Sequence, residues 1–394
     1  MNGSQLQISA STMVNATGAG KAATLVAIKN QVSGLERSNY PGLEFETWLG
    51  RVSGLESSPV EDKLKEYDCR NNRLAKFALD TDDFRLAVER MKNQYGSHRI
   101  GVFLGTSTSG IAATEEAYCQ RESDVPLPVS FDLLHTHNVA SVVAYTRKSL
   151  GLNGPGICLS TACSSSAKVF AVAQRHIDAG ICDAAIVGGV DSLCLTTLYG
   201  FNSLQLVSAM PCRPWDSGRD GINIGEAAGF ALLEPAKEAS AIVLQGYGES
   251  SDAYHMSTPH PEGAGAILAM KMALQQAEID SKDIGYINLH GTATPSNDAA
   301  EDSAVNSVFG TEVPCSSTKG WTGHTLGAAG ITEALIGAMV LEHGILPATL
   351  NHEKQDSQLQ VNVLRENRQA SVTYVMSNSF GFGGSNCSLI LARR

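Results

Sequence analysis

The sequence lacks long hydrophobic runs and strongly basic segments, and these two absences exclude several classes of protein. No 18 consecutive apolar residues occur among its 394 residues, so we expect no transmembrane helix and no membrane partner. The 29 lysines and arginines are outnumbered by 40 acidic residues, and the net charge of -11 argues against a general nucleic-acid binder. The first five residues also lack the basic-then-apolar pattern of a secretion signal. We therefore expect a soluble cytoplasmic protein.

Paired cysteine motifs are also absent, although cysteine itself is not. Nine cysteines are present, and none forms a C-x-x-C pair or has the spacing of zinc ligands. This pattern predicts that the protein has no resident metal and that its thiols are free, as in a reducing compartment. Most free cysteines are inert, buried packing residues. A catalytic role for any one of them must therefore be argued from its partners.

Short apolar strands alternate with helical stretches along the chain, a pattern typical of an α/β protein with largely parallel sheets. The expected strands are 99–105, 156–160, 183–189, 241–244, 284–290, 313–317, 372–377 and 388–391. The expected helices are 131–150, 164–179, 264–277, one after Pro295, and 324–343. The two halves repeat a similar order of elements. We predict an N-terminal half, residues 1–236, and a C-terminal half, residues 237–394, joined near 234–238.

Cys163 occupies the most informative position among the nine cysteines. It follows an apolar strand and precedes a helix rich in alanine and β-branched residues. The first turn of a helix presents unpaired backbone N–H groups and the positive end of the helix dipole. Both features favour thiolate over thiol and can stabilise an oxyanion. The pattern is that of acyl transfer through a thioester, with inert packing as the alternative.

Two histidines stand where strands or loops give way to helices, as active residues of parallel α/β proteins do. His290 ends an apolar strand, and His324 precedes an apolar helix. Both could converge on Cys163 to donate N–H groups or transfer protons near neutral pH, or each could simply cap or pack. Glu333 lies among apolar neighbours on the helix predicted over 324–343, so its carboxylate is expected to be buried. A buried carboxylate needs a partner, and Lys319 is a candidate.

A glycine-rich run, residues 380–386 (FGFGGSN), follows another apolar strand. Its glycines permit positive φ and close approach to a ligand, so it could supply a second oxyanion N–H. A hairpin turn is the alternative, because glycine marks hairpins too. A phosphate loop is disfavoured, since the run has no P-loop lysine and no helix after it.

Taken together, these segments resemble the elongating β-ketoacyl-acyl-carrier-protein synthases, condensing enzymes of the thiolase superfamily. The similarity extends over roughly residues 100–394, and the first hundred residues match more loosely. The matching motifs, in order, are 161–165 (TACSS), 213–216 (RPWD) with 219–221 (RDG), 225–229 (GEAAG), 251–256 (SDAYHM), 290–294 (HGTAT), 317–319 (STK) with 323–330 (GHTLGAAG), and 378–386 (NSFGFGGSN).

This resemblance implies a five-layer αβαβα thiolase fold made of two similar halves. It also implies the reaction: Cys163 takes an acyl group as a thioester, and decarboxylation of malonyl-acyl-carrier protein gives a carbanion that attacks it. The product is a β-ketoacyl chain two carbons longer, on a fatty-acid, polyketide or polyene pathway. Acyl carrier protein would be the partner substrate. The enzyme would be a homodimer, or a heterodimer with a chain-length-factor-like homologue.

The resemblance further implies a role for each site residue. His290 and His324 would assist decarboxylation, and Lys319 and Glu333 would order the histidine site. The backbone N–H groups of Cys163 and Phe382 would hold the first oxyanion. The substrate contacts and gates implied by the family are Thr292 and Thr294 on the phosphopantetheine arm, and Phe382, Phe380, Phe201 and Thr108 around the acyl pocket. No cofactor is implied, because the phosphopantetheine arm arrives on the carrier protein.

The chain departs from the family pattern at several positions. Residues 105–110 (GTSTSG) are richer in hydroxyl groups than an aliphatic pocket wall, and Thr108 stands where an apolar residue is common. Ala293 replaces a serine. The N-terminal sequence resembles synthases of aryl-polyene or related secondary pathways. For docking the acidic carrier protein, Arg70 and Arg73 are the best basic candidates.

Three related functions fit the residues less well. A degradative thiolase would need a second catalytic cysteine in a C-terminal glycine loop, whereas Cys387 follows Asn386. The initiating synthases use Cys-His-Asn, which the motif around His324 contradicts. A non-catalytic chain-length factor replaces the nucleophile, yet Cys163 is present. We therefore expect an active elongating synthase.

Overall fold

The computed structural model describes residues 5–121, 126–128, 131–237 and 242–394. One mixed sheet runs through it from the N-terminal to the C-terminal half. Its strands follow the order β12-β11-β15-β16-β10-β1-β9-β7-β5-β6, with β2 paired to β1. The bounds are β1 Leu6–Asn15, β2 Gly18–Ala19, β5 Ile100–Gly105, β6 Gly156–Leu159, β7 Ala184–Asp191, β9 Ala227–Pro235, β10 Ile242–Ser251, β11 Ile284–Asn288, β12 Cys315–Ser316, β15 Tyr374–Gly381 and β16 Ser385–Arg393. Small sheets add β3 Leu35–Arg37, β4 Trp48–Gly50 and β8 Ile224–Gly225, and β13 Ile345–Leu346 with β14 Arg368–Gln369.

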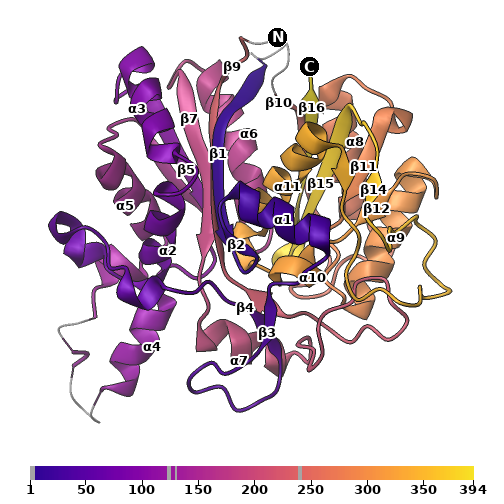
Figure 1. Cartoon of the computed structure of the whole chain (residues 1–394), viewed down its shortest axis with the longest axis horizontal. Helices are drawn as coiled ribbons and strands as arrows, with labels where there is room; N and C mark the ends of the chain where they lie inside the picture. Colours follow the sequence, from indigo (N-terminus) through magenta and orange to yellow (C-terminus); the bar gives the residue numbers. More distant parts are fainter. Residues whose placement is uncertain (1–4, 122–125, 129–130, 238–241) are drawn as a thin grey trace.

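The helices form three layers around this sheet (Figure 1). Helices α2 (Arg70–Leu79), α3 (Phe84–Tyr95) and α5 (Ser141–Leu150) cover the N-terminal strands, and α8 (Ala264–Ala277) and α9 (Pro295–Phe309) lie outside the C-terminal strands. Helices α6 (Ser165–Asp178) and α11 (Ala329–His343) lie between, each in contact with strands of both halves. The remaining helices are α1 Lys21–Asn30, α4 Ile111–Cys119, α7 Leu195–Ser203 and α10 Lys319–Thr322. The predicted five-layer αβαβα architecture is confirmed.

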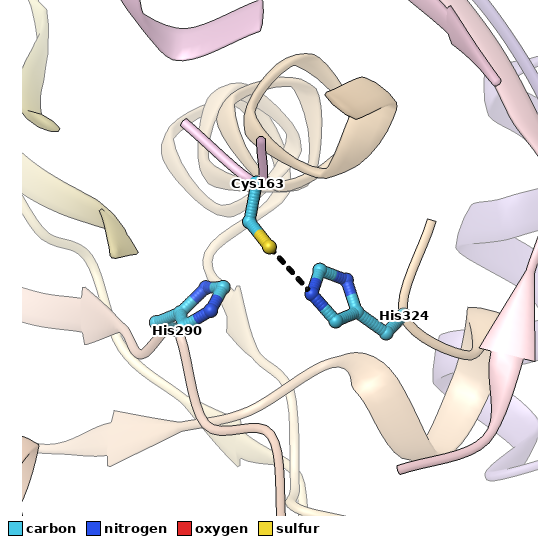
Figure 2. A group of neighbouring side chains, drawn as sticks. All are labelled: Cys163, His290 and His324. Atoms are coloured by element: carbon cyan, nitrogen blue, oxygen red, sulfur yellow. Dashed lines mark hydrogen bonds between the residues drawn. The ribbon is translucent and has the colours of Figure 1, made fainter. Parts of the chain in front are cut away.

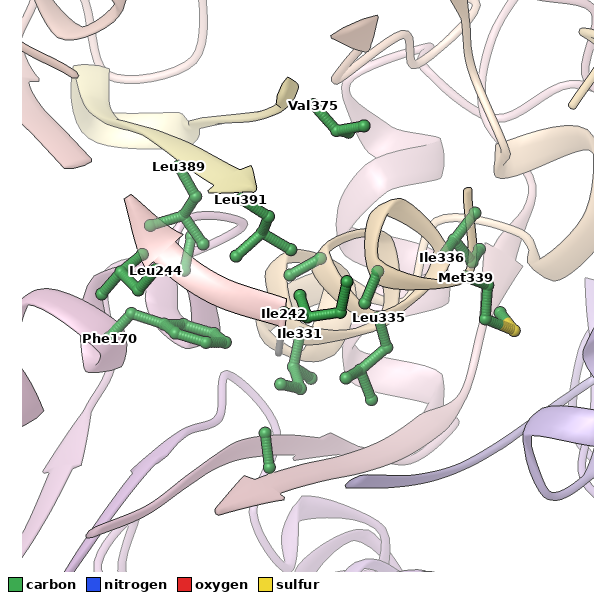
Figure 3. Close-up of a cluster of buried hydrophobic side chains, with 14 of the residues drawn as sticks. Phe170, Ile242, Leu244, Ile331, Leu335, Ile336, Met339, Val375, Leu389 and Leu391 are labelled. Atoms are coloured by element: carbon green, nitrogen blue, oxygen red, sulfur yellow. The ribbon is translucent and has the colours of Figure 1, made fainter. Parts of the chain in front are cut away.

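The two halves meet through a short strand contact and a shared core. Strand β1 pairs with β10 only over Leu6↔Leu244 and Gln7↔Val243, so the sheet divides into two layers on either side of this seam. The core between the layers is made of α6, α11 and the strand faces that they cover (Figure 3). The division predicted after residue 236 falls between β9 and β10. Ala241, expected at the start of the latter strand, lies outside the described residues.

Helix α11 is the centre of the molecule. Every residue from Ala329 to Leu341 is buried, as expected for a helix that is apolar on all sides. In the described chain the stretch Leu326–His343 is long and apolar enough to cross a membrane, but 89% of it is buried inside the protein, as in a core helix. At its start Gly330 meets α6 so closely that an added Cβ would lie 2.4 Å from the Ala167 nitrogen. The absence of a side chain there lets the two central helices approach each other.

The predicted helix 131–150 was wrong in its first half. The chain instead forms a π-helical turn, Leu133–His137, followed by extended backbone at Asn138 and then α5. The Asp132 side chain accepts hydrogen bonds from Leu134 N–H and His135 N–H, which caps the short turn. The Asn138 side chain likewise accepts from Ala140 N–H. Short polar side chains that bond the nearby backbone break a helical run in this way.

Candidate active site

Cys163 lies in the tight turn between β6 and α6. Ala162, just before it, has φ +51°, a left-handed conformation that alanine rarely adopts. Neighbouring hydroxyl groups hold this turn: Ser165 Oγ donates to Ala162 O at 2.6 Å and accepts from Thr161 N–H at 2.8 Å. The serines after the cysteine therefore have a definite structural role, which the sequence analysis did not assign to them. The helix itself begins at Ser165.

Cys163, His290 and His324 face one another in a buried group (Figure 2). The distance from His324 Nε2 to Cys163 Sγ is 3.0 Å, and the two imidazole rings pack edge to face with centroids 5.4 Å apart. The two histidines come from the C-terminal half and the cysteine from the N-terminal half. The sequence predicted this convergence, and the structure brings the three side chains together as expected.

Burial controls the protonation of all three side chains. It raises the pKa of Cys163 to about 11, although the charge of Lys319 and the backbone N–H groups of Phe382 and Cys163 oppose it. Burial, together with the charge of Lys319, holds the pKa values of His290 and His324 well below their ordinary value. The resting state is therefore a neutral thiol beside neutral imidazoles. The backbone N–H groups lower the pKa of the thiol as expected, but desolvation is the larger effect and raises it overall.

The hydrogen bonds on the far side of each ring fix its tautomer. Leu326 N–H donates to His324 Nδ1 at 3.3 Å, and the Lys319 ammonium lies 3.4 Å from His290 Nδ1. Since both donors face Nδ1, each neutral ring must carry its proton on Nε2. The Nε2–H of His324 then points at the sulfur. Both histidines are thus placed as hydrogen-bond donors.

Lys319 and Glu333 form a buried ion pair behind His290, with Lys319 Nζ 2.5 Å from Glu333 Oε1. Lys319 also donates to the backbone carbonyl of His290. Burial raises the pKa of Glu333 to about 7, against the lowering effect of the lysine charge. The pairing suggested by the sequence is present, and it ties α10 and α11 to the end of β11.

A cavity of about 590 Å³, including its open mouth, reaches the cysteine and both histidines. Thr292 and Thr294 line it, their hydroxyl groups 2.8 Å apart, and Phe380 lines it beside the His290 ring. Phe201 and Phe382 pack with ring centroids 5.5 Å apart at the same cavity. The glycine-rich run forms the hairpin between β15 and β16, which was one of its two interpretations. It also brings Phe382 N–H to the Cys163 sulfur, and the oxyanion role of that N–H stays a prediction.

Thr108 does not line this cavity. It is buried, and both its backbone N–H and its hydroxyl donate to the Asp191 carboxylate, at 2.8 and 2.7 Å. The Thr108 hydroxyl, expected to make the pocket wall more polar, is therefore hydrogen-bonded to Asp191 inside the protein.

The two arginines predicted to dock a carrier protein are also engaged elsewhere. Arg70 forms ion pairs with Glu56 and with the fully buried Glu226, and Arg73 pairs with Asp68. These pairs neutralise both guanidinium groups. Arg70 and Arg73 therefore serve the fold, and their part in docking a carrier protein stays a prediction.

Sequence reasoning missed the carboxylate that holds the His290 loop. Glu301, on α9, accepts hydrogen bonds from His290 N–H and Gly291 N–H, both at 2.8 Å. Burial raises its pKa to about 7. A signal was available: Asp298, Glu301 and Asp302 recur at helical spacing after Pro295, and all three are buried. Apolar residues were also missed, since Leu206 and Ile222 line the cavity.

Two family models match consecutive parts of the chain. Residues 81–239 match "Beta-ketoacyl synthase, N-terminal domain", and residues 241–353 match "Beta-ketoacyl synthase, C-terminal domain". Among curated proteins, the chain is 36% identical over 334 residues to 3-oxoacyl-[acyl-carrier-protein] synthase 2 of Vibrio harveyi, covering 80% of this chain and 79% of that protein. The protein of the same name from Staphylococcus aureus is 32% identical over 369 residues, covering 88% and 91%.

Solved structures give the same result. The chain is 39% identical, with a TM-score of 0.92, to a chain in the structure of the ketosynthase ApeO in complex with its chain length factor ApeC from Xenorhabdus doucetiae, covering 99% of this chain and 98% of that one. A β-ketoacyl synthase from Burkholderia phymatum is 27% identical with a TM-score of 0.87, covering 99% and 100%.

Proposed function

This chain belongs to the β-ketoacyl synthase family, acyltransferases that lengthen acyl chains on acyl carrier protein in fatty-acid or polyketide synthesis, and we propose that Cys163 carries the acyl group while His290 and His324 assist decarboxylation. One observation carries this assignment. A cysteine sulfur and two imidazole rings, brought together from opposite halves of the chain, face one cavity.

In the loading step the Cys163 sulfur attacks the thioester carbonyl of the acyl carrier, and the carrier thiol leaves. The cysteine proton ends on that thiol, so the exchange is neutral in charge. The carbonyl oxygen becomes negative as the new C–S bond forms. The backbone N–H groups of Cys163 and Phe382 both interact with the sulfur, which supports them as the donors that stabilise this oxyanion.

In the condensing step malonyl-acyl-carrier protein occupies the same cavity. Loss of CO₂ leaves the electron pair of the broken C–C bond on the thioester as an enolate. The Nε2–H groups of His290 and His324 can both donate to the enolate oxygen, which stabilises the charge as it develops. The carbanion then attacks the acyl-Cys163 carbonyl, a new C–C bond forms, and the cysteine sulfur leaves as a thiolate. This thiolate takes up one proton from solvent to return to the resting thiol. The product is a β-ketoacyl chain two carbons longer.

The remaining side chains fit supporting roles. Lys319, held by Glu333, fixes the tautomer of His290. Thr292 and Thr294 offer hydroxyl groups along the cavity to a phosphopantetheine arm, and Phe382 with Phe201 closes one of its walls. The proposed chemistry uses no cofactor. Cys163, His290 and His324 also present ligand atoms within 4.8 Å of one another, a group that could hold a metal ion, so metal analysis of the active enzyme belongs with the test below.

We also propose the partners. Acyl carrier protein delivers both substrates, and a homologous subunit, either a second copy of this chain or a chain-length-factor-like protein, binds along β6. The β6 strand forms one end of the sheet, and Leu133, Leu134 and Val139 are 59%, 66% and 43% exposed. These three residues, here called the apolar edge surface, lie next to the strand, since Cys158 Sγ contacts Val139 O. The similar ketosynthase ApeO was solved with its chain length factor.

All nine cysteines are free, which supports a cytoplasmic location.

The experiment separates the two half-reactions by mass spectrometry of the enzyme and of the carrier. Cys163→Ala should accept no acyl group and form no condensed product, yet it should still release CO₂ from malonyl-acyl-carrier protein, because both histidines remain. His324→Ala should still be acylated but should decarboxylate about 10²–10³-fold more slowly, the usual cost of losing one oxyanion donor.

Leu268→Asp serves as the control, because Leu268 is 50% exposed on the outer helix α8 and does not line the cavity. Chain extension by Cys163→Ala would refute the assignment. Equal loss of both half-reactions in His324→Ala would refute the role given to that histidine. Activity that is lost on chelation and restored by a metal ion would favour the metal site instead.

A further inference from the structure

Asp191 is a buried carboxylate that the proposed reaction leaves unused. It is the last residue of β7 and has no exposed surface. Its Oδ1 accepts the hydroxyl of Thr106 at 2.7 Å, both donors of Thr108, and Ser107 N–H at 2.8 Å. Its Oδ2 accepts Gly327 N–H at 2.5 Å and also lies 3.0 Å from Ser107 N–H.

All five donors are neutral, and three of them are backbone N–H groups, which cannot accept a hydrogen bond. This arrangement favours the carboxylate, whereas burial opposes ionisation and raises the pKa of Asp191. Burying an ion without a counter-ion costs several kcal/mol unless hydrogen bonds satisfy it fully. Two separate loops supply the hydrogen-bond donors to Asp191: one follows β5, and the other carries His324.

The second loop connects Asp191 to the active site through two hydrogen bonds and the peptide link between Leu326 and Gly327. Gly327 N–H is held by the carboxylate. The preceding residue, Leu326, has φ +53°, a strained left-handed conformation. The N–H of Leu326 in turn donates to His324 Nδ1, the bond that leaves the ring proton on Nε2 facing Cys163.

Gly327 also has no room for a side chain. A Cβ there would lie 2.7 Å from Asp191 Oδ2 and 2.8 Å from Ser107 Oγ. The loop is therefore fitted tightly against the carboxylate, and its backbone cannot shift without breaking the contact.

We infer that Asp191 is a positioning residue that sets the tautomer and direction of His324 through Gly327 and Leu326. This inference rests on the proposed function only for its effect on rate. The tautomer itself is a property of the resting enzyme, and it can be measured without substrate.

The test is Asp191→Asn. The four donors around Oδ1 keep the amide oxygen there, so the amide nitrogen replaces Oδ2 and points its hydrogens at Gly327 N–H. We expect the His324 ring, observed by ¹⁵N NMR of histidine-labelled enzyme, to change from a single Nε2–H tautomer to a mixture. Malonyl decarboxylation should fall about 10- to 100-fold, as for a misplaced catalytic group, with kcat affected more than KM. Acylation of Cys163 should change much less.

Asp183→Asn is the matched control: it is the same substitution at the residue just before the other end of β7, on a carboxylate paired with Arg99 at the surface. It should leave both tautomer and rates unchanged. If Asp191→Asn does not fold, as judged by circular dichroism, Gly327→Ala displaces the same contact from the loop side and should give the same NMR change. A folded variant of either kind that keeps the single Nε2–H tautomer overturns the inference. If wild-type enzyme shows no condensation, the proposed function fails, and the NMR result still decides the role of Asp191.

Discussion

At the residue scale, the protonation of Cys163 distinguishes two accounts of its reactivity. A helix terminus that dominated would give a thiolate near neutral pH, whereas burial raises the pKa to about 11. We therefore predict that alkylation of Cys163 by iodoacetamide, followed by mass spectrometry after short pulses, rises about tenfold per pH unit from pH 7 to pH 10, because only the thiolate reacts. Cys163→Ala gives the background from the other eight cysteines. A rate that levels off by about pH 8 would contradict the dominance of burial.

Single residues also show what sequence can and cannot predict. Cys163, His290 and His324 were predictable because each stands at the end of an element, where parallel strands gather their loops. Thr108 was not, because the sequence does not show that its hydroxyl group meets Asp191, 83 positions further along. The sequence likewise does not show that Arg70, a candidate for carrier docking, pairs with Glu226, which is 156 positions away and fully buried. Residue type gives the chemistry that is available, and only the fold shows whether it is already engaged.

At the element scale, the close approach of α6 and α11 places the cysteine and the histidines in one cavity. We predict that Gly330→Ala destabilises the protein by about 1–3 kcal/mol, the range for overpacking, although alanine is the better helix former. The reason is that its Cβ would meet the backbone of Ala167. Chemical denaturation measures the change.

Gly200→Ala is the matched control, because Gly200 is an exposed helical glycine on α7 with no atom within 4 Å of an added Cβ. This variant should be more stable than wild type by about 0.5–1 kcal/mol. If Gly330→Ala is equally stabilised, the two central helices are not in tight contact.

The elements themselves were predictable where apolar periodicity was unbroken, as in β5, α6 and α11. The region 131–150 failed because Asp132 and Asn138 form hydrogen bonds with nearby backbone that compete with a helix. The sequence also did not predict that a single sheet crosses both halves. Its seam depends on the pairing of Leu6 with Leu244, a contact between segments with no local signal for each other.

At the scale of the whole molecule, the apolar edge surface marks where a homologous subunit would bind. Exposed leucines beside the edge strand of a sheet promote aggregation unless another chain covers them. We predict that Leu134→Asp shifts the purified enzyme from a dimeric assembly toward the mass of one chain, 41.6 kDa, in size-exclusion chromatography with light scattering. The charge would have to be buried against the partner, whereas in the free chain Leu134 is already 66% exposed.

Stability of the separated chain should change by no more than about 0.5 kcal/mol, as for other surface substitutions. Leu268→Asp is the control, since Leu268 is 50% exposed on α8 in the opposite outer layer. It should leave the assembly intact. A Leu134→Asp protein that assembles as fully as this control would show that the subunits meet elsewhere. A chain that is monomeric before any substitution, and dimeric only with a chain-length-factor-like homologue, would identify that homologue as the partner, because β6 would then be covered by a different sequence.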